Sequence, residues 1–328
     1  MAVLPDTVSV MNEAWDCLVI LDACRYDYFE RLWRDYFDSG ELSCRSTIGT
    51  ATVQWRDRSF TGRYEDVVYV SANPYINSRK SVKGFCGGEH FHKVYDVWAH
   101  GWDERLGTVP PEAVTTAAAE AAARHADKRL IVHYLQPHAP YLSLGEDCRG
   151  FPTPDVEQPD IMTGLSGPEE DSKFQRKLLA RLLPLAERTP VFGHPAEWTL
   201  RRLLRMSPKS PMDAALRKVG RRGLRKAYEA NLRRVLAQVI VLLPHLHGRV
   251  VVTSDHGERL GEWRQFTHVP DSDSRYLRHI PWLVLDRPPR AVGPGGSSGL
   301  APGAGADPTT GDEQSKIEQR LRSLGYID

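Results

Sequence analysis

The chain has 328 residues, of which 41% are hydrophobic and 26% are charged, so it is long enough to bury the core of one large α/β domain or of two smaller domains. Its net charge of +1 points to no particular partner. The longest apolar runs, such as 17–21 and 239–246, are far shorter than the roughly 20 residues of a membrane-spanning helix. The sequence therefore predicts no transmembrane segment.

The first residues, "MAVLPDTVSVMNEAWD", contain neither a basic segment nor a continuous apolar segment, so no signal peptide is expected. The five cysteines are scattered without CxxC spacing, and their odd number fits a reduced compartment better than a disulfide framework. Both observations predict a cytoplasmic protein.

The first predicted strand, "CLVIL" at 17–21, runs directly into Asp22 and the polar segment "DACRYD". A second strand is expected at 66–72. Between it and the next strand lies "GFCGGEHFH", in which Cys86, His90 and His92 could suggest zinc, but their spacing is poor for a zinc site.

A helix with proline at its start and dense alanine is predicted at 111–126. The strand "RLIVHYL" at 129–135 follows and ends in "QPHAPY", which contains His138. Residues 142–220 are rich in proline, arginine and lysine with weak periodicity, so they are interpreted as an insertion or a small cap.

The segment from Arg201 to Arg234 carries twelve Lys or Arg residues and only two acids. Such a stretch is usually a solvated helix face, although it could also attract an anionic substrate or a phospholipid surface. Part of it belongs to a helix predicted at 224–243, whose apolar residues repeat every three or four positions.

The strand at 249–254 leads into "SDHGERLGE", where Asp255 and His256 come directly after apolar residues. A last strand is predicted at 280–286. Residues 287–312 form a Pro/Gly/Ser linker, and a final helix at 313–328 is expected to dock through apolar side chains. These docking side chains are Ile317, Leu321 and Leu324.

Continuous apolar strands separated by helices predict an α/β fold with a mainly parallel central sheet covered by helices on both faces. We expect residues 1–286 to form this catalytic domain, with 142–220 as its inserted cap. Functional groups of such sheets gather at the carboxyl ends of the strands. Asp22, Asp255 and His256 would meet there as oxygen and nitrogen ligands of a divalent cation, whereas Asp255 and His256 alone could equally be a solvated turn.

Four motifs together resemble the sulfatase-like branch of the alkaline phosphatase superfamily. They are "LVILDACRYDYF", "LIVHYLQPHAPY", "VVVTSDHGERLGE" with His268 downstream, and the ending "IEQRLRSLGYID". The resemblance covers nearly the whole chain except the 142–220 insertion and the linker. It implies an alkaline phosphatase-like fold and a metal-dependent ester-cleaving enzyme.

The resemblance also implies roles for individual residues. The first-strand acid of the family matches Asp22, and its metal-binding pair matches Asp255 and His256. Its substrate-contacting histidines match His138 and His268. Counting back nine residues from Thr61–Gly62 places the nucleophile at Thr52, which would also bind the metal. Thr50 is the alternative nucleophile, because a threonine in this loop could instead be a turn or helix cap.

The segment "TVQWR" departs from true sulfatases, which carry Cys-x-Pro-x-Arg or Ser-x-Pro-x-Arg and oxidise the first residue to formylglycine. Thr52 offers neither a thiol nor a primary alcohol, and Gln54 replaces the proline. We therefore expect cleavage of a phosphate monoester or diester through a metal-activated Thr52 and a phosphothreonine intermediate.

Three alternatives remain open at this point: a phosphotransferase acting on a sugar or cell-surface polymer, a sulfatase without formylglycine, and a silent anion-binding protein. One divalent metal is expected, as Mn²⁺, Mg²⁺ or Zn²⁺ and less readily as Ca²⁺. His138 and His268 could in principle hold a second ion. Glu258 is expected to orient the metal pair, and Arg25 with Asp27 to form a structural ion pair.

The expected substrate is an anionic small molecule or a glycan or lipid phosphate ester. No nucleic acid is expected, because the arginines of 201–234 have few aromatic residues between them. Contact with the membrane would be peripheral.

Overall fold

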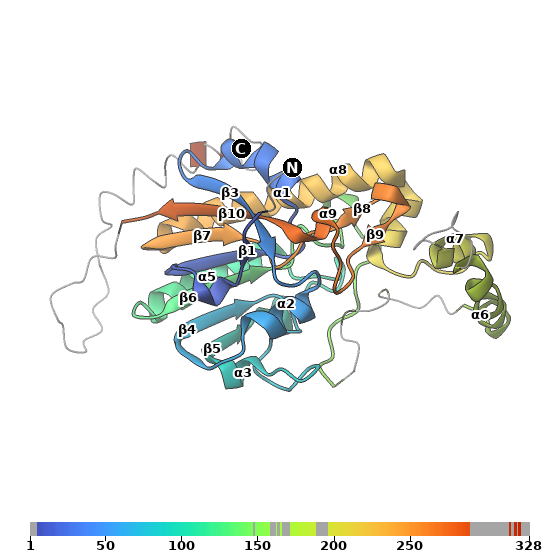
Figure 1. Cartoon of the computed structure of the whole chain (residues 1–328), viewed down its shortest axis with the longest axis horizontal. Coiled ribbons are helices and arrows are strands. Elements are labelled where there is room, and N and C mark those ends of the chain that lie inside the picture. The colour runs from blue at the N-terminus through green and yellow to red at the C-terminus, as the bar shows by residue number, and fades with distance from the viewer. Residues whose placement is uncertain are drawn as a thin grey trace.

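The computed structural model describes residues 5–146, 148–157, 162, 165, 171–187, 196–288, 315, 318–319 and 321–322. Within these residues the main feature is an eight-stranded sheet in the order β1-β3-β10-β7-β2-β6-β4-β5 (Figure 1). Strand β10 is antiparallel to both of its neighbours, and the other neighbouring strands are parallel. In sheet order the strands are β1 (Thr7–Val8), β3 (Glu41–Thr47), β10 (His279–Asp286), β7 (Arg249–Thr253), β2 (Cys17–Leu21), β6 (Arg129–Tyr134), β4 (Tyr64–Ser71) and β5 (Phe91–Asp96). The predicted mainly parallel α/β fold is confirmed.

Strand β2 shows why the sheet is covered on both faces. Its five residues are all buried, and successive side chains point to opposite faces. Cys17, Val19 and Leu21 belong to one hydrophobic core, while Leu18 and Ile20 belong to the other. A strand with two buried faces has no place for polar residues until it ends, which explains the abrupt change from "CLVIL" to Asp22.

Three long helices supply apolar residues to the larger core. They are α1 (Tyr26–Tyr36), α5 (Pro111–Arg124) and α8 (Pro211–Leu242), and α8 contacts both of the others. The smaller core includes residues of α2 (Thr52–Ser59) and of the segment around α3 (Gly87–His90). The remaining short helices are α4 (Val97–His100) and α9 (Arg275–Arg278).

Helix α8 begins thirteen residues before the predicted start at Leu224, inside the expected insertion. Ser210 caps it by accepting a hydrogen bond from the backbone N–H of Asp213 at 3.3 Å. Gly220 interrupts the helix with φ 66° and ψ 179°, a conformation that glycine adopts without steric cost. Because Gly220 interrupts the helix, the apolar periodicity of 211–223 is weak, and the first part of α8 was not predicted from the sequence.

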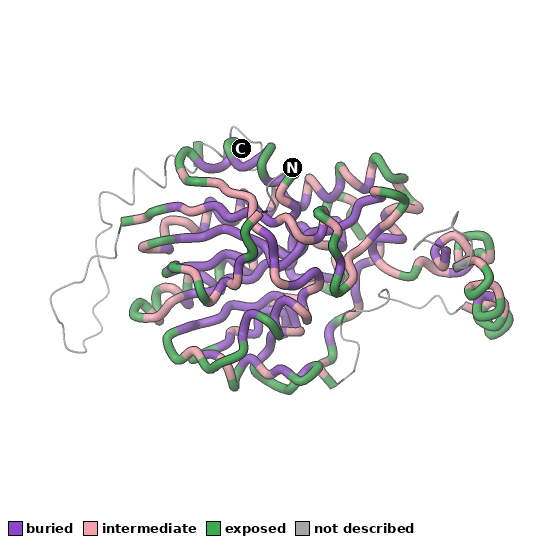
Figure 2. The backbone as a smooth tube through the Cα atoms, in the orientation of Figure 1, coloured by how far each residue is buried: buried purple, intermediate pink, exposed green. Residues whose placement is uncertain are grey.

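The rest of the expected insertion contains the helices α6 (Lys173–Glu187) and α7 (Ala196–Leu203), which pack on each other. In Figure 1 they lie to one side of the sheet, beyond β8 (Arg259–Leu260) and β9 (Phe266–Thr267). Figure 2 shows the contrast in burial between them and the central strands. No helix in the described part of the chain has both the length and the apolar composition needed to cross a bilayer.

Two predictions fall mostly outside the described residues. Of the linker at 287–312, only Arg287 and Pro288 are described. In the predicted final helix, Ile317 and Leu324 are outside the described residues, whereas Leu321 is 7% exposed and belongs to the larger core. Docking through Leu321 is therefore seen, and the other two contacts stay predictions.

Candidate active site and metal centre

The candidate site lies where β7, β2 and β6 end side by side. The turn after β2 is joined to the turn after β7 by Ser254, whose hydroxyl oxygen lies 2.6 Å from the carbonyl oxygens of Leu21 and His256 and accepts a hydrogen bond from the Cys24 N–H at 2.8 Å. The sheet order therefore brings two segments more than 200 residues apart in the chain into direct contact.

Asp22, Asp255 and His256 form a buried cluster at this edge. One ligand atom from each lies within 4.8 Å of the others, and the three residues are at most 3% exposed. Nε2 of His256 is 3.3 Å from Oδ2 of Asp255 and 3.9 Å from Oδ1 of Asp22. The three predicted ligands thus converge, although they come from two separate loops.

Thr52 completes the cluster from the first turn of α2. Its Oγ1 donates a hydrogen bond to Oδ2 of Asp255 at 2.8 Å and lies 3.1 Å from Nε2 of His256. The hydroxyl of Thr50 is used elsewhere, because it donates to the carbonyl of Val269 at 2.7 Å and accepts from the N–H of Ser272 at 3.1 Å. Of the two threonines considered from the sequence, only Thr52 reaches the cluster.

Backbone groups hold Asp255 in its position. Its Oδ1 accepts hydrogen bonds from the N–H groups of Ala23 at 3.0 Å and of His256 at 2.8 Å. Ala23 has φ 60°, a strained value for alanine that aims its N–H at this carboxylate. Gly257 is required for packing, since a Cβ there would lie 2.1 Å from the carbonyl oxygen of Tyr276.

The two carboxylates have opposite pKa shifts. Burial raises the pKa of Asp22 well above its usual value, and the negative charge of Asp255 adds to the rise. Burial alone would also raise the pKa of Asp255, but the imidazoles of His256 and His133 and the donated hydrogen bonds outweigh it, so this pKa is lowered. A positive charge near Asp22 would relieve its repulsion with Asp255.

His256 is in the right state to act as a ligand. Burial lowers its pKa to about 4, so the ring is neutral at physiological pH. Its Nδ1 lies 2.8 Å from the carbonyl oxygen of Gly257, which requires the proton to be on Nδ1. The lone pair of Nε2 therefore points into the cluster with Asp22 and Asp255.

These residues fit a divalent cation. Oδ1 of Asp22 is buried and has no hydrogen-bond partner among the described residues, which is costly for a carboxylate oxygen. Two carboxylates, a hydroxyl and one imidazole are the donors that suit Zn²⁺, Mn²⁺ or Mg²⁺. Asp22, Thr52, Asp255 and His256 would hold the ion.

A second group, made of His138, Glu258 and His268, lies next to this cluster, and one ligand atom from each lies within 4.8 Å of the others. Nδ1 of His268 is 3.3 Å from both carboxylate oxygens of Glu258, and Nε2 of His138 is 3.9 Å from one of them. The ring centroid of His268 is 4.2 Å from that of His256. Both predicted substrate-contacting histidines therefore lie beside the cluster that contains Thr52.

Glu258 lies beside both histidines, but their pKa values shift in opposite directions. Burial would lower the pKa of His268, but the adjacent Glu258 carboxylate outweighs this and raises it. For His138 burial dominates, so its pKa is lowered despite Glu258. His268 is thus the more readily protonated imidazole beside Thr52, and this contact of Glu258 was not anticipated from the sequence.

Two buried residues next to Asp22 were not predicted from the sequence. Nδ2 of Asn73, just after β4, donates to Oδ2 of Asp22 at 2.9 Å, and Nε2 of His133 in β6 is 4.0 Å from the same atom. A histidine inside an apolar strand was the available signal for His133. The expected ion pair of Arg25 with Asp27 is present at 2.6 Å, and Arg25 also pairs with Glu262 at 2.7 Å.

The zinc interpretation of Cys86, His90 and His92 finds no support in the described residues, where only the two clusters above bring three metal-binding groups together. Nδ1 of His90 lies 2.7 Å from the carbonyl oxygen of Gly62 and its ring stacks on Phe85.

No family model matches the sequence, and no curated protein matches it either. The fold is similar to solved structures. The soluble domain of lipooligosaccharide phosphoethanolamine transferase A from Neisseria meningitidis matches at 17% identity, with 88% of this chain and 78% of that chain covered and a TM-score of 0.43. The C-terminal periplasmic domain of EcEptC from Escherichia coli, in complex with Zn, matches at 14% identity over 87% and 74% of the two chains, with a TM-score of 0.45.

A putative sulfatase from Bacteroides thetaiotaomicron matches at 13% identity over 84% of this chain and 65% of that chain, with a TM-score of 0.47. A 2-O GAG sulfatase is also among the matched structures, at 13% identity and a TM-score of 0.42. The cytoplasmic location expected from the sequence is contradicted, because matched domains from Escherichia coli and Campylobacter jejuni are periplasmic. That expectation relied on the N-terminal residues and on the scattered cysteines, and neither belongs to the candidate active site.

Proposed function

We propose that this protein is a metal-dependent enzyme that cleaves a phosphate ester with Thr52 as its nucleophile. One observation carries the proposal: Oγ1 of Thr52 lies 2.8 Å from Asp255 and 3.1 Å from His256, inside a buried set of metal-binding groups. A threonine that only capped a helix would not need a buried carboxylate and an imidazole at its hydroxyl.

A bound divalent cation would lower the pKa of the Thr52 hydroxyl and neutralise charge on the phosphoryl oxygens. The chain itself positions the reacting groups. Thr52 is the first residue of α2, and its N–H lies at a helix N-terminus, which favours an anionic phosphoryl group. The Asp255 carboxylate accepts a hydrogen bond from the hydroxyl, which orients the hydroxyl and lets Asp255 receive its proton.

In the first step the Thr52 oxygen forms a bond to phosphorus while the bond from phosphorus to the leaving oxygen breaks. The leaving oxygen needs a proton, and His268 is placed to give it, because its pKa is raised by Glu258. Nδ1 of His268 faces Glu258, so Nε2 is the nitrogen available to the substrate. The product of this step is phosphothreonine at position 52 and a free alcohol.

In the second step the oxygen of water bonds to phosphorus, the bond between phosphorus and the Thr52 oxygen breaks, His268 accepts the proton that water loses, and Asp255 returns a proton to the Thr52 oxygen. If an alcohol of a sugar or a lipid takes the place of water, the same residues transfer the phosphoryl group. Hydrolase and transferase therefore share the first step and differ only in the acceptor.

The test compares hydrolysis of an aryl phosphate monoester, an aryl phosphodiester and an aryl sulfate by the metal-loaded wild type, Thr52→Ala and Thr50→Ala. We expect phosphate esters to be preferred, Thr52→Ala to lose at least about 1000-fold in kcat/KM, and Thr50→Ala to keep most activity. Full activity of Thr52→Ala, or a preference for the sulfate, would contradict the proposal. Products formed with an added alcohol distinguish transfer from hydrolysis.

A further inference from the structure

Helices α6 and α7 expose apolar residues that a protein normally buries. Among the described residues, four large apolar side chains are mostly exposed: Phe174 at 74%, Leu185 at 61%, Leu203 at 72% and Trp263 at 87%. Three of these four belong to α6 and α7, although these two helices form a small part of the chain. In Figures 1 and 2 both helices lie apart from the sheet, and α6 has a long exposed face.

The exposed side of α6 follows the helical repeat. Its exposed residues are Lys173, Phe174, Arg176, Lys177, Ala180, Arg181, Pro184 and Leu185, in pairs that recur every three to four positions. Phe174 and Leu185 stand near the two ends of this face, and lysines and arginines stand between them. Arg202, Leu203 and Arg205 add exposed basic and apolar residues at and just after the end of α7, which contacts α6. We call this set of exposed basic and apolar residues the cap face.

Several cations of the cap face have no anionic partner among the described residues. Lys173, Lys177, Arg181 and Arg202 form no ion pair with any other residue that the structure describes. Two acids that the structure describes near these helices are already paired, Asp171 with Arg201 and Glu197 with Lys209. Exposed cations that pair with no described acid favour an anionic surface outside the protein.

Charge and apolar exposure together limit what that surface can be. A purely ionic partner such as nucleic acid would bind the lysines and arginines but would leave Phe174, Leu185 and Leu203 in water. A helix with Lys and Arg beside exposed Phe and Leu is typical of peptides that lie in a membrane interface, where the apolar side chains enter the acyl boundary and the cations bind lipid phosphates.

We propose that the cap face binds the surface of an anionic lipid membrane. Helix α7 connects this face to the candidate active site, because the ring of Trp198 packs on Phe266 of β9 with centroids 5.5 Å apart, and His268 follows two residues later. A membrane bound to the cap face would therefore be held beside the loop that carries His268 and the exposed Trp263. Binding does not depend on the proposed catalysis.

Cosedimentation of the full chain with lipid vesicles tests the proposal. We expect the wild type to bind vesicles of phosphatidylcholine mixed with phosphatidylglycerol and to bind vesicles of phosphatidylcholine alone at least about 10-fold more weakly. Replacing three cations in K173Q/K177Q/R181Q should weaken binding to the anionic vesicles roughly 100-fold. Replacing the apolar residues in F174Q/L185Q/L203Q should weaken it roughly 10-fold or more.

The matched control is R63Q/K93Q/R124Q, which removes the same charge from exposed positions on or near β4, β5 and α5. Its vesicle binding should equal that of the wild type. All substitutions are at exposed residues, so the melting temperatures should be close to that of the wild type.

The proposal would be wrong if the wild type did not bind anionic vesicles, or if the control variant lost as much binding as the cation variant. It would also be wrong if F174Q/L185Q/L203Q bound as well as the wild type, because the cap face would then bind anions without entering a membrane. Tighter binding to duplex DNA than to anionic vesicles would likewise overturn it. Hydrolysis of a soluble phosphate ester by the same variants should be unchanged, which separates this proposal from the proposed function.

Discussion

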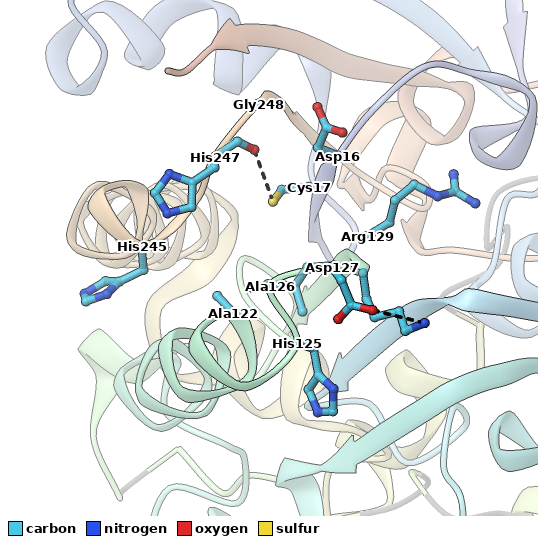
Figure 3. A pocket seen from close by; sticks show the side chains of 12 residues that line it. Asp16, Cys17, Ala122, His125, Ala126, Asp127, Arg129, His245, His247 and Gly248 are labelled. Atoms are coloured by element: carbon cyan, nitrogen blue, oxygen red, sulfur yellow. Dashed lines mark hydrogen bonds and ion pairs between the residues drawn. The ribbon is translucent and has the colours of Figure 1, made fainter. Parts of the chain in front are cut away.

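The two ends of the central strands carry similar residues but differ in how those residues are partnered. At the carboxyl ends of β2 and β7 stand Asp22, Asp255 and His256. At the amino ends of β2, β6 and β7 a hollow of about 310 Å³ is lined by Asp16, Cys17, His125, Asp127, Arg129 and His247, among others (Figure 3). Both ends therefore have carboxylates and imidazoles, and only one of them resembles an active site.

Each acid at the amino end already has a partner. Oδ2 of Asp16 accepts the N–H of Arg249 at 2.6 Å, and Asp127 pairs with Lys128 at 3.4 Å. Cys17 donates a hydrogen bond to the carbonyl oxygen of His247, and burial raises the pKa of its thiol to about 11. At the carboxyl end Asp22 and Asp255 are buried together, and Oδ1 of Asp22 has no partner among the described residues. The unsatisfied buried carboxylate oxygen, more than the residue types, distinguishes the candidate metal centre.

The largest expected difference between the two ends concerns activity. Asp255→Asn should reduce kcat/KM at least about 1000-fold, because it removes a metal ligand and the acceptor of the Thr52 proton. Asp127→Asn at the amino end should change kcat/KM less than about twofold. Steady-state kinetics with an aryl phosphate ester measures both, and equal losses would remove the distinction between the two ends.

Metal should stabilise the folded protein through the carboxyl end only. At a free metal concentration of about 100 Kd, the free energy of unfolding should rise by about 2.7 kcal/mol. His256→Ala should remove most of this gain, while His247→Ala should keep it. Denaturant titration with and without a chelator measures the gain, and a full gain in His256→Ala would contradict the assignment.

Without metal, the repulsion between Asp22 and Asp255 should destabilise the fold. Asp22→Asn should therefore raise the free energy of unfolding of the metal-free protein by about 1 kcal/mol or more, because it removes a buried negative charge beside another carboxylate. The same variant should bind metal poorly.

Asp16→Asn is the control at the amino end, and it should lower the free energy of unfolding by about 1 kcal/mol because it weakens the hydrogen bond to Arg249. Chemical denaturation after metal removal gives both values. If Asp22→Asn lowered the free energy of unfolding as much as Asp16→Asn, the charge of Asp22 would not destabilise the metal-free fold.

The difference between the two ends of the central strands could be predicted from the sequence only in part. Apolar strands such as "CLVIL" end where their buried faces end, so the carboxyl edge and its acids at 22 and 255 could be predicted. The resemblance of the motifs supplied Thr52, His138 and His268. The first part of α8 was missed because Gly220 breaks its periodicity.

Other features of the site depend on three-dimensional contacts that no local pattern contains. Asn73 is adjacent to Asp22 only because β4 pairs with β6 and β6 pairs with β2. The strained Ala23 gives no local signal, since alanine does not mark positive φ. The raised pKa of His268 likewise depends on Glu258, which reaches it across a turn.

The central claim, that Thr52 is the nucleophile, is tested most directly by acid quenching the metal-loaded protein during turnover of an aryl phosphate ester and locating the phosphoryl group by peptide mass spectrometry. We predict phosphothreonine at Thr52 in the wild type and in Thr50→Ala, and none in Thr52→Ala. A phosphoryl group on Thr50, or an active Thr52→Ala variant, would contradict the account.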